Sequence, residues 1–311
     1  MATPQAVPRA LVIGSEGNIG APLVRRLRED GYEVLETDIR PGTGGEYLMA
    51  DINHPVDLLP AFDWGPEIVF ILSAMVSRVT CEQASGLAIA TNLAGVNNVL
   101  QLCKRVGAMT VYFSTSEVYG PDVELMEETL PDPRPNNRYG LSKLLGEKVV
   151  EYEVRTYGLR AVTLRPFMIY DEYEELGEHR SAMIRFASNL AAGKPVDVHR
   201  GSARGWMHIS DAVRAVEAAA RVRAYTVINV GHPDVRPIEE LAELVRAELG
   251  APEELLRLVD LPPQMTLVKR PSLERQQTIL GVEPEVSLED GVRRVCETMR
   301  RRLAAAVTAP Q

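Results

Sequence analysis

Short hydrophobic runs of strand length alternate along the chain with longer segments in which apolar residues recur at helical spacings. Apolar runs bounded by glycine or polar residues are typical of buried strands, whereas spacings of three and four residues are typical of amphipathic helices. Their alternation predicts a parallel sheet flanked by helices. The expected strands cover 9–13, 32–37, 46–50, 68–72, 110–114, 160–166 and 227–231, and the clearest expected helices cover 21–30, 92–102 and 239–249.

The composition is that of a globular protein. The chain has 311 residues, a formal net charge of −9, 45% hydrophobic residues and 25% charged residues. These values exclude disordered, collagen-like and coiled-coil proteins as overall classes. The acidic balance argues against a nucleic-acid partner, which favours a basic surface. A phosphorylated ligand stays compatible with it, because backbone amides can bind phosphate without an excess of positive charge.

Neither a membrane span nor a targeting segment is indicated. No apolar run reaches the length of about 18 residues that a spanning helix needs, and residues 1–9 lack the apolar core of a signal peptide. Cys81, Cys103 and Cys296 stand at scattered positions without the spacing of a zinc or redox motif. We therefore expect a cytoplasmic protein with no membrane partner, no metal site and reduced thiols.

Three glycines separate the first expected strand from the first expected helix, and an aspartate ends the second strand. This order forms a dinucleotide-binding pattern, in which the turn admits the pyrophosphate and the helix N-terminus attracts it. The aspartate accepts from the adenosine ribose and repels a 2′-phosphate, which favours NAD, although an arginine two residues later tempers that preference. A plain turn between a strand and a helix is the alternative. The residues expected around this part of the cofactor are Gly14, Gly17, Asn18, Ile19, Gly20, Asp38 and Arg40.

Candidate catalytic residues follow the strand expected at 110–114. Residues 114–120 stand at its carboxyl end, where an open parallel sheet places its chemistry. Tyr139 and Lys143 are four residues apart, so a helix presents them on one face. A nearby ammonium lowers the pKa of a phenol, which could then act as a base near neutral pH. An ordinary exposed pair of helical side chains is the alternative.

These motifs together resemble the extended short-chain dehydrogenase/reductases, in the branch of nucleotide-sugar epimerases, dehydratases and decarboxylases. The glycine spacing G-x-x-G-x-x-G, the Tyr139–Lys143 pair and the stretch 202–211 carry the resemblance, as do 270–271, 280–284 and 287–291 near the end. It implies a Rossmann-type doubly wound parallel sheet with a smaller substrate-binding lobe, and NAD as the cofactor. It also implies further contacts to the cofactor by Asp51, Ile52, Leu72, Ser73, Ala74, Asn92, Tyr139, Lys143 and Pro166.

The stretch Thr115-Ser116-Glu117 resembles that of UDP-glucuronate decarboxylases. The resemblance implies that Thr115 binds the sugar C4 oxygen and that Tyr139 takes the C4 hydroxyl proton while hydride passes to NAD. Sugar 4,6-dehydratases carry an Asp as the acid where this chain has Ser116. A 4-keto uronic acid loses carbon dioxide to leave a stabilised enolate, so the enzyme mainly orients the carboxylate and protonates that enolate. We expect Glu117 and Arg204 to do this.

The substrate and the reaction leave alternatives open. Glu117 could instead accept from loop amides, and Arg204 could bind the diphosphate. A UDP-sugar or UDP-uronate 4-epimerase is the second candidate, and a ketoreductase or a catalytically silent NAD-binding regulator is less favoured. The chain also departs from the family, since an Asn that contacts the diphosphate is Met168 here and residues 171–178 form a strongly acidic loop. The expected substrate-binding residues are Ser116, Phe167, Met168, Arg180, Arg204 and Arg270.

The resemblance also implies how the chain is divided. Residues 1–165, with 206–232 returning to them, are expected to form the NAD-binding domain. Residues 166–205 and 233–311 are expected to form most of the substrate-binding lobe. Family members commonly dimerise through two helices, here near 92–104 and 139–156, so we expect a homodimer that binds a UDP-linked sugar.

Overall fold

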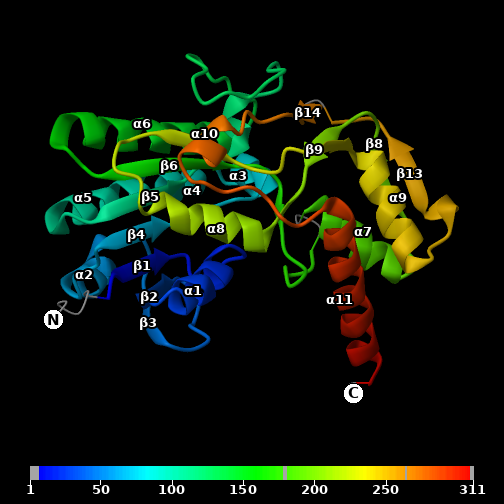
Figure 1. Ribbon diagram of the computed structural model, residues 1–311, viewed down its shortest axis with the longest axis horizontal. Helices are drawn as coiled ribbons and strands as arrows, with labels where there is room; N and C mark the ends of the chain where they lie inside the picture. Colours follow the sequence, from blue (N-terminus) through cyan, green and yellow to red (C-terminus); the bar gives the residue numbers. More distant parts are fainter. Residues whose placement is uncertain (1–6, 178–180, 263–264, 309–311) are drawn as a thin grey trace.

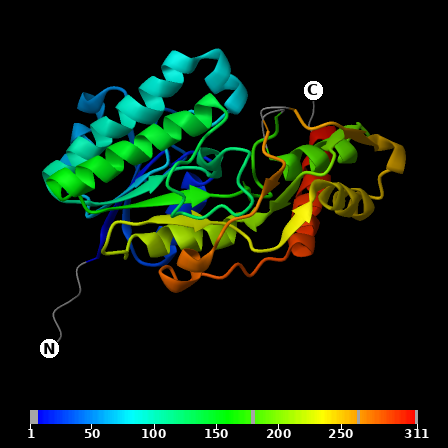
Figure 2. The ribbon, with the colours of Figure 1, turned by 90° about the horizontal axis from the view of Figure 1, so that it is seen from above.

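A computed structural model describes residues 7–177, 181–262 and 265–308. It consists of a large part built around one sheet and a smaller lobe beside it (Figures 1 and 2). The central sheet has seven parallel strands in the order β11-β6-β5-β4-β1-β2-β3. This order confirms the predicted Rossmann-type fold. The strands are β1 (Arg9–Ile13), β2 (Glu33–Asp38), β3 (Glu46–Met49), β4 (Ile68–Ile71), β5 (Met109–Phe113), β6 (Ala161–Pro166) and β11 (Val227–Val230).

Helices cover both faces of this sheet, as the continuous apolar strands require. Successive residues of a strand point to opposite faces, and in β1 the pair Ala10 and Val12 packs on one side while Leu11 and Ile13 pack on the other. Figure 2 shows α5 and α6 above the sheet and α8 below it. The helices of this part are α1 (Gly20–Glu29), α2 (Pro55–Asp63), α3 (Arg78–Gln83), α4 (Ser85–Ile89), α5 (Val96–Val106), α6 (Arg138–Tyr157) and α8 (Ile209–Ala219).

The helix expected at 92–102 is split in the structure. Residues Ala90–Gly95 form a π-helix, η1, and α5 begins only at Val96. The wider turn accompanies the buried Asn92, whose side chain bonds the backbone of Met75 and the hydroxyl of Ser142. These contacts fasten η1 both to the segment after β4 and to α6.

The smaller lobe has its own apolar core, in which α7 (Ala182–Ala191), α9 (Ile238–Leu249) and α11 (Leu288–Thr308) pack together. Figure 1 shows these three helices beside the β8–β13 pair, away from the large sheet. Short strands complete the lobe and its junction with the sheet. They are β7 (Ile169–Tyr170), β8 (Val196–His199), β9 (Ala203–Gly205), β10 (Met207–His208), β12 (Val235–Pro237), β13 (Leu256–Val259) and β14 (Val268–Lys269), together with the short helices η3 (Glu253–Leu255) and α10 (Glu274–Thr278).

The chain crosses between the two parts more than once. Strand β11 pairs with β6 in the large sheet, although α7 of the lobe lies between them in the sequence. Leu280 and Val282, beyond α10, also pack into the core beneath the sheet. The exact division into a cofactor domain and a substrate lobe remains a prediction.

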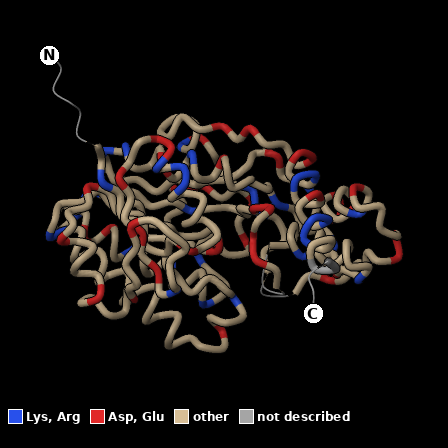
Figure 3. Tube along the Cα trace, turned by 90° about the horizontal axis from the view of Figure 1, so that it is seen from below, with Lys and Arg blue, Asp and Glu red and all other residues tan. Residues whose placement is uncertain are grey.

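The distribution of charged residues and the hydropathy of the described helices are those expected from the composition. Acidic and basic residues are interspersed along the trace in Figure 3. Among the helices that the structure describes, none combines the length and the apolar character needed to span a membrane. Cys81, Cys103 and Cys296 are all buried as free thiols.

Candidate active site

A cavity of about 1050 Å³ opens where the carboxyl ends of the parallel strands face the lobe. Its walls come from the loops that follow β1, β2, β3, β4, β5 and β6, and from α7, β9 and β14 of the lobe. Such a crevice outside the strand ends is where open α/β sheets bind ligands. The volume lies at the upper end of the range of roughly 300–1000 Å³ for one ligand, so it suits a cofactor together with a substrate.

The glycine-rich turn forms one end of this cavity. Gly14 has a φ of +93°, and a Cβ there would lie 2.8 Å from the backbone nitrogen of Ser73. A Cβ on Gly20 would lie 2.1 Å from the carbonyl oxygen of Gly14, so α1 can start close against β1 only with glycine. The N-terminus of α1 therefore faces the cavity and can receive a pyrophosphate, as the pattern predicted.

The Asp38 carboxylate stands at the end of β2 beside this turn. Its oxygens accept from the backbone amides of Glu16 and Arg40, at 3.1 Å each. The Arg40 guanidinium forms ion pairs with Asp38 at 3.6 Å and with Glu175 at 3.3 Å. Arg40 thus contacts the loop of the lobe, and its charge is partly neutralised at the place where a 2′-phosphate would need it. This arrangement fits NAD.

Most residues expected around the cofactor line the cavity together, and the chemistry of the set suits a dinucleotide. It combines glycine turn amides, a carboxylate at the ribose end and small side chains after β4. The lining includes Gly14, Gly17, Asn18, Ile19, Gly20, Asp38, Arg40, Asp51, Ile52, Leu72, Ser73, Ala74, Tyr139 and Pro166. Asn92 and Lys143 do not line it, because both side chains are buried behind the wall.

The catalytic candidates meet at the end of β5. Thr115 begins the short 3-10 helix η2 (Ser116–Tyr119) and accepts from the amide of Glu117 at 3.2 Å. Asn137 caps α6, with its side-chain oxygen accepting from the amide of Gly140 at 2.8 Å. The Asn137 amide group also donates to Glu117 at 2.9 Å. These bonds fix Thr115, Glu117 and the first turn of α6, with Tyr139, as one unit on the cavity wall.

The effect of Lys143 on the pKa of Tyr139 differs from the one predicted. Burial raises the pKa of Tyr139, and only the hydrogen bond with Thr115 counteracts it. The Lys143 ammonium instead lies 4.5 Å from the centre of the Tyr112 ring. Burial lowers the pKa of Lys143 to about 7, although the charge of Glu147 raises it. The prediction that Lys143 lowers the phenol pKa is therefore wrong for this structure, because the ammonium points toward β5.

Lys269 is a functional candidate that the sequence reasoning missed, as are Arg78 and Arg185. Its ammonium bonds the Glu117 carboxylate at 2.6 Å and the Ser116 hydroxyl at 3.2 Å. Both Lys269 and Glu117 line the cavity. Burial opposes the carboxylate form of Glu117, but the charges of Lys269 and Arg78 outweigh it and lower the pKa of Glu117 to about 2. In the sequence, the one feature that could have indicated Lys269 is its position directly before Arg270-Pro271, and Arg270 was the residue predicted to bind the substrate there.

Arg204 lines the cavity but is already committed to backbone acceptors. Its guanidinium donates to the carbonyl oxygens of Ala203 and Leu267, at 2.7 Å each, and to that of Thr266. Burial lowers the pKa of Arg204 to about 10. Among the residues that the structure describes, Arg78 and Arg185 line the same cavity with no ion pair and no side-chain hydrogen bond to a protein group.

The other expected substrate residues are distributed differently. Met168 lines the cavity and has a φ of +25°, a left-handed conformation that is rare outside glycine and asparagine. Phe167 points away into a small core and packs on Tyr119 at a ring separation of 6.1 Å. Arg270 is exposed and does not line the cavity, since the neighbouring Lys269 takes the inward position of β14. Arg180 lies outside the described residues.

The acidic loop beginning at Asp171 is part of the wall as far as the structure describes it. Asp171 is buried, and burial raises its pKa. Glu172 bonds His208 at 2.8 Å, and Glu174 accepts from the Ser181 hydroxyl at 2.9 Å. Glu175 bonds Arg40 across the cavity. The acidic side chains are therefore paired or buried within the fold.

Comparison with known proteins gives the family. A model of the NAD dependent epimerase/dehydratase family matches residues 10–231, more than half of the chain. UDP-glucuronic acid decarboxylase 6 of Arabidopsis thaliana is 27% identical over 313 residues, covering 96% of this chain and 91% of that protein.

Solved structures agree with this match. The UDP-glucose 4-epimerase of Thermotoga maritima, crystallised with UDP-glucose, has a TM-score of 0.85 and 26% identity, covering 95% of this chain and 99% of that one. MoeE5 in complex with UDP-glucuronic acid and NAD shares the fold, with a TM-score of 0.84 and 24% identity over 94% of this chain and 99% of that one. The chain belongs to the NAD-dependent epimerase/dehydratase family, whose cofactor is NAD.

Proposed function

We propose that this enzyme uses NAD to oxidise C4 of a UDP-linked sugar and that it decarboxylates UDP-glucuronate. The observation that carries the proposal is the Glu117–Lys269 ion pair, which lies in the cavity beside Thr115 and Tyr139. A carboxylate and an ammonium held together near the sugar can serve proton transfer and charge stabilisation after the ketone has formed. Simple ketone formation does not need both groups.

The first step removes the C4 hydroxyl proton and the C4 hydride. Tyr139 takes the proton, and Thr115 hydrogen bonds both the phenol and the C4 oxygen, which stabilises the phenolate form. NAD supplies the chemistry of accepting the hydride and of returning it later. Asp38 and the turn at Gly14 hold the cofactor in this role, and Lys143 supports it from behind the wall.

The second step breaks the bond between C5 and the carboxylate carbon. Carbon dioxide leaves, and the electron pair passes to C5 and the C4 oxygen as an enolate. The Lys269 ammonium, 2.6 Å from Glu117, can stabilise that negative charge and relay a proton to C5 through the Ser116 hydroxyl or water. Glu117 keeps Lys269 charged and turned into the cavity. The product is a UDP-4-keto-pentose, or UDP-xylose when the hydride is returned.

The charges of the cavity suit a substrate with several negative charges. Arg78 and Arg185 line it and form no ion pair and no side-chain hydrogen bond among the described residues, so their guanidinium groups can bind ligand oxygens. A UDP-uronate presents a diphosphate and a carboxylate. We assign these two arginines to those anions, in place of Arg270, and regard Arg204 as a support of the wall.

The test is incubation of the protein with NAD and UDP-glucuronate, with products followed by mass spectrometry and reduced nicotinamide followed by absorbance. Loss of the carboxyl mass supports the proposal. An isomer of unchanged mass contradicts it and favours a 4-epimerase, the alternative suggested by the similarity to the UDP-glucose 4-epimerase of Thermotoga maritima. Absence of turnover with every UDP-sugar contradicts both. A homodimer remains a prediction, and light scattering of the purified protein tests it.

A further inference from the structure

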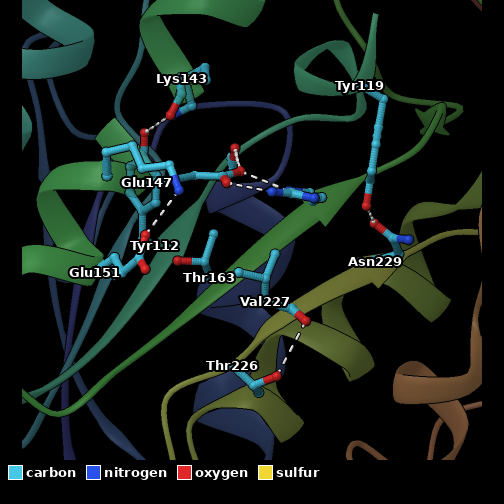
Figure 4. A network of polar contacts seen from close by, with 12 residues as sticks. Tyr112, Tyr119, Lys143, Glu147, Glu151, Thr163, Thr226, Val227 and Asn229 are labelled. Carbon is cyan, nitrogen blue, oxygen red and sulfur yellow. Dashed lines mark hydrogen bonds and ion pairs between the residues drawn. The ribbon is translucent and has the colours of Figure 1, made fainter. Parts of the chain in front are cut away.

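Glu147 is a buried carboxylate on α6, two turns beyond Tyr139 and one turn beyond Lys143. Arg165 donates two hydrogen bonds to it, at 3.0 and 2.7 Å, and the Ser114 hydroxyl donates a third. Figure 4 labels Glu147 within this network of polar contacts. The carboxylate does not line the cavity, so any effect that it has on the site must pass through the residues it contacts.

Both hydrogen-bond partners of Glu147 directly precede, in the chain, a residue that lines the cavity. Ser114 precedes Thr115 at the end of β5, and Arg165 precedes Pro166 at the end of β6. The Arg165 guanidinium also lies 4.7 Å from the centre of the Tyr119 ring at the end of η2. One carboxylate therefore connects the helix that carries Tyr139 with two strand ends that carry other cavity residues.

The charge of the same carboxylate also acts on the Lys143 ammonium, one turn earlier on α6. Charged and titratable groups around Lys143 are Tyr112 on β5, Tyr139 and Glu147 on α6, and Arg165 on β6. Beyond Tyr139 lie Cys81 of α3 and Glu117 of η2. Glu147 is the group among these whose charge favours the ammonium form of Lys143. Without it, burial alone would favour the neutral amine.

Stability does not account for this arrangement. A buried ion pair contributes little compared with apolar side chains of the same volume, because both charges lose their hydration. We propose that Glu147 is a positioning residue, which fixes the Thr115 and Tyr139 walls at their working separation and holds a negative charge one helical turn from Lys143. Both decarboxylation and epimerisation need hydride transfer, so this role of Glu147 applies to either reaction. The proposal rests on the proposed function only for the activity measurement.

Glu147→Gln tests this role, because glutamine keeps the shape and removes the charge. Glu153→Gln is the matched control, since Glu153 is also buried on α6 and paired, with Lys104 at 2.9 Å, but faces away from the cavity. Rates of nicotinamide reduction by UDP-glucuronate are measured from pH 5 to 9.

Removal of a neighbouring anion lowers the pKa of an ammonium group by about one unit or more. We expect the high-pH limb of the Glu147→Gln rate profile to shift to lower pH by at least one pH unit, and kcat at pH 7 to fall about five-fold or more. The affinity for NAD, followed by fluorescence, should stay within about two-fold of the wild-type value. Glu153→Gln should keep the wild-type profile. Coincident profiles for wild type and Glu147→Gln overturn the proposal.

Glu147→Gln leaves Arg165 without its buried partner and could unfold the chain. The double variant Glu147→Gln/Arg165→Met removes both charges and avoids that cost. The double variant should show the same downward shift of the high-pH limb, because Arg165 has no comparable effect on Lys143. A wild-type profile in a folded double variant shows a structural role only and overturns the proposal.

A readout without substrate separates this proposal from the proposed function. In protein labelled with ¹⁵N at the lysine side chains, the Lys143 signal is assigned with Lys143→Arg and followed against pH. The wild-type signal should titrate near 7, and the Glu147 variants should titrate lower. An unchanged titration overturns the proposal even when no UDP-sugar is turned over. A lowered titration supports it whatever substrate the enzyme uses.

Discussion

The Lys269 ammonium lies 2.6 Å from a carboxylate oxygen of Glu117, although 152 residues separate the two in the chain. Glu117 follows a strand of the large sheet, and Lys269 ends β14 in the lobe region. The pair spans the junction of the two parts and faces the cavity from both sides. The Lys269 ammonium also donates to the Ser116 hydroxyl at 3.2 Å, so a hydroxyl lies beside the pair.

Lys269→Met should separate decarboxylation from ketone formation. Loss of the ammonium removes the stabilisation of the enolate and the proton relay, so the decarboxylated product should form about 100-fold more slowly. Nicotinamide reduction should fall less, because Tyr139 and Thr115 are untouched. Product mass and absorbance in a single turnover measure the two steps. Arg270→Met, at the exposed neighbouring position, is the control and should match wild type. An equal loss of both steps would contradict the assignment.

Tyr139→Phe should abolish hydride transfer while NAD stays bound. The substitution removes the proposed base but leaves the glycine turn and Asp38, which we expect to hold the other end of the cofactor. We expect nicotinamide reduction to fall by about 100-fold or more, with unchanged affinity for NAD in fluorescence titration. Tyr173→Phe is a matched control on an exposed tyrosine. Normal turnover in Tyr139→Phe would show that another group is the base.

Arg78→Ala should weaken binding of the uronate more than binding of the neutral sugar. The loss of one charge-assisted hydrogen bond to a carboxylate or phosphate weakens binding about ten-fold or more. A rise in KM for UDP-glucuronate, with a smaller rise in the Kd of UDP-glucose, assigns Arg78 to the sugar carboxylate. Equal rises for both ligands assign it to the diphosphate. Arg270→Ala should change neither constant, and unchanged constants in Arg78→Ala would refute the assignment.

Met168→Asn should stabilise the protein. The left-handed backbone at Met168 costs most side chains about 1 kcal/mol, whereas asparagine tolerates it. We expect a higher denaturation midpoint in urea, with Met168→Leu as the control that keeps both the strain and the apolar volume. A lower midpoint for Met168→Asn would show that the packing of the methionine outweighs the strain. Substrate affinity measured in the same samples tells whether the new amide contacts the ligand.

Local patterns predicted much of this molecule. Gly14 and Asp38 belong to a pattern whose parts lie within one βαβ unit, and the covalent chain places them together. The strands were predictable because buried parallel strands must be apolar on both faces. The positions of Tyr139 and Thr115 in the cavity wall were predictable, because the helix spacing and the strand end each limit where these side chains can lie.

Contacts made by distant parts of the chain were not predictable in the same way. Lys269 and Arg185 reach the cavity only because the lobe folds against the strand ends, and no local spacing records that approach. Arg270 was expected to bind the substrate, whereas in the structure Lys269 is the residue of β14 that lines the cavity and Arg270 is exposed. The direction of the Lys143 ammonium depends on the Tyr112 ring across the sheet, which helix geometry alone cannot supply.

Lys269 lies late in the chain, so it is synthesised well after Glu117. At about 5–20 residues per second, the ribosome adds Lys269 on the order of ten seconds after Glu117. Until then the carboxylate lacks its ammonium partner, although Asn137 can already donate to it, and the sheet lacks β11 for most of the same interval. A nascent chain can therefore form the first βαβ unit early, while the site closes only when the last quarter of the protein has emerged. We expect truncation before β14 to leave Glu117 without the Lys269 ammonium and to open the cavity wall that β14 forms.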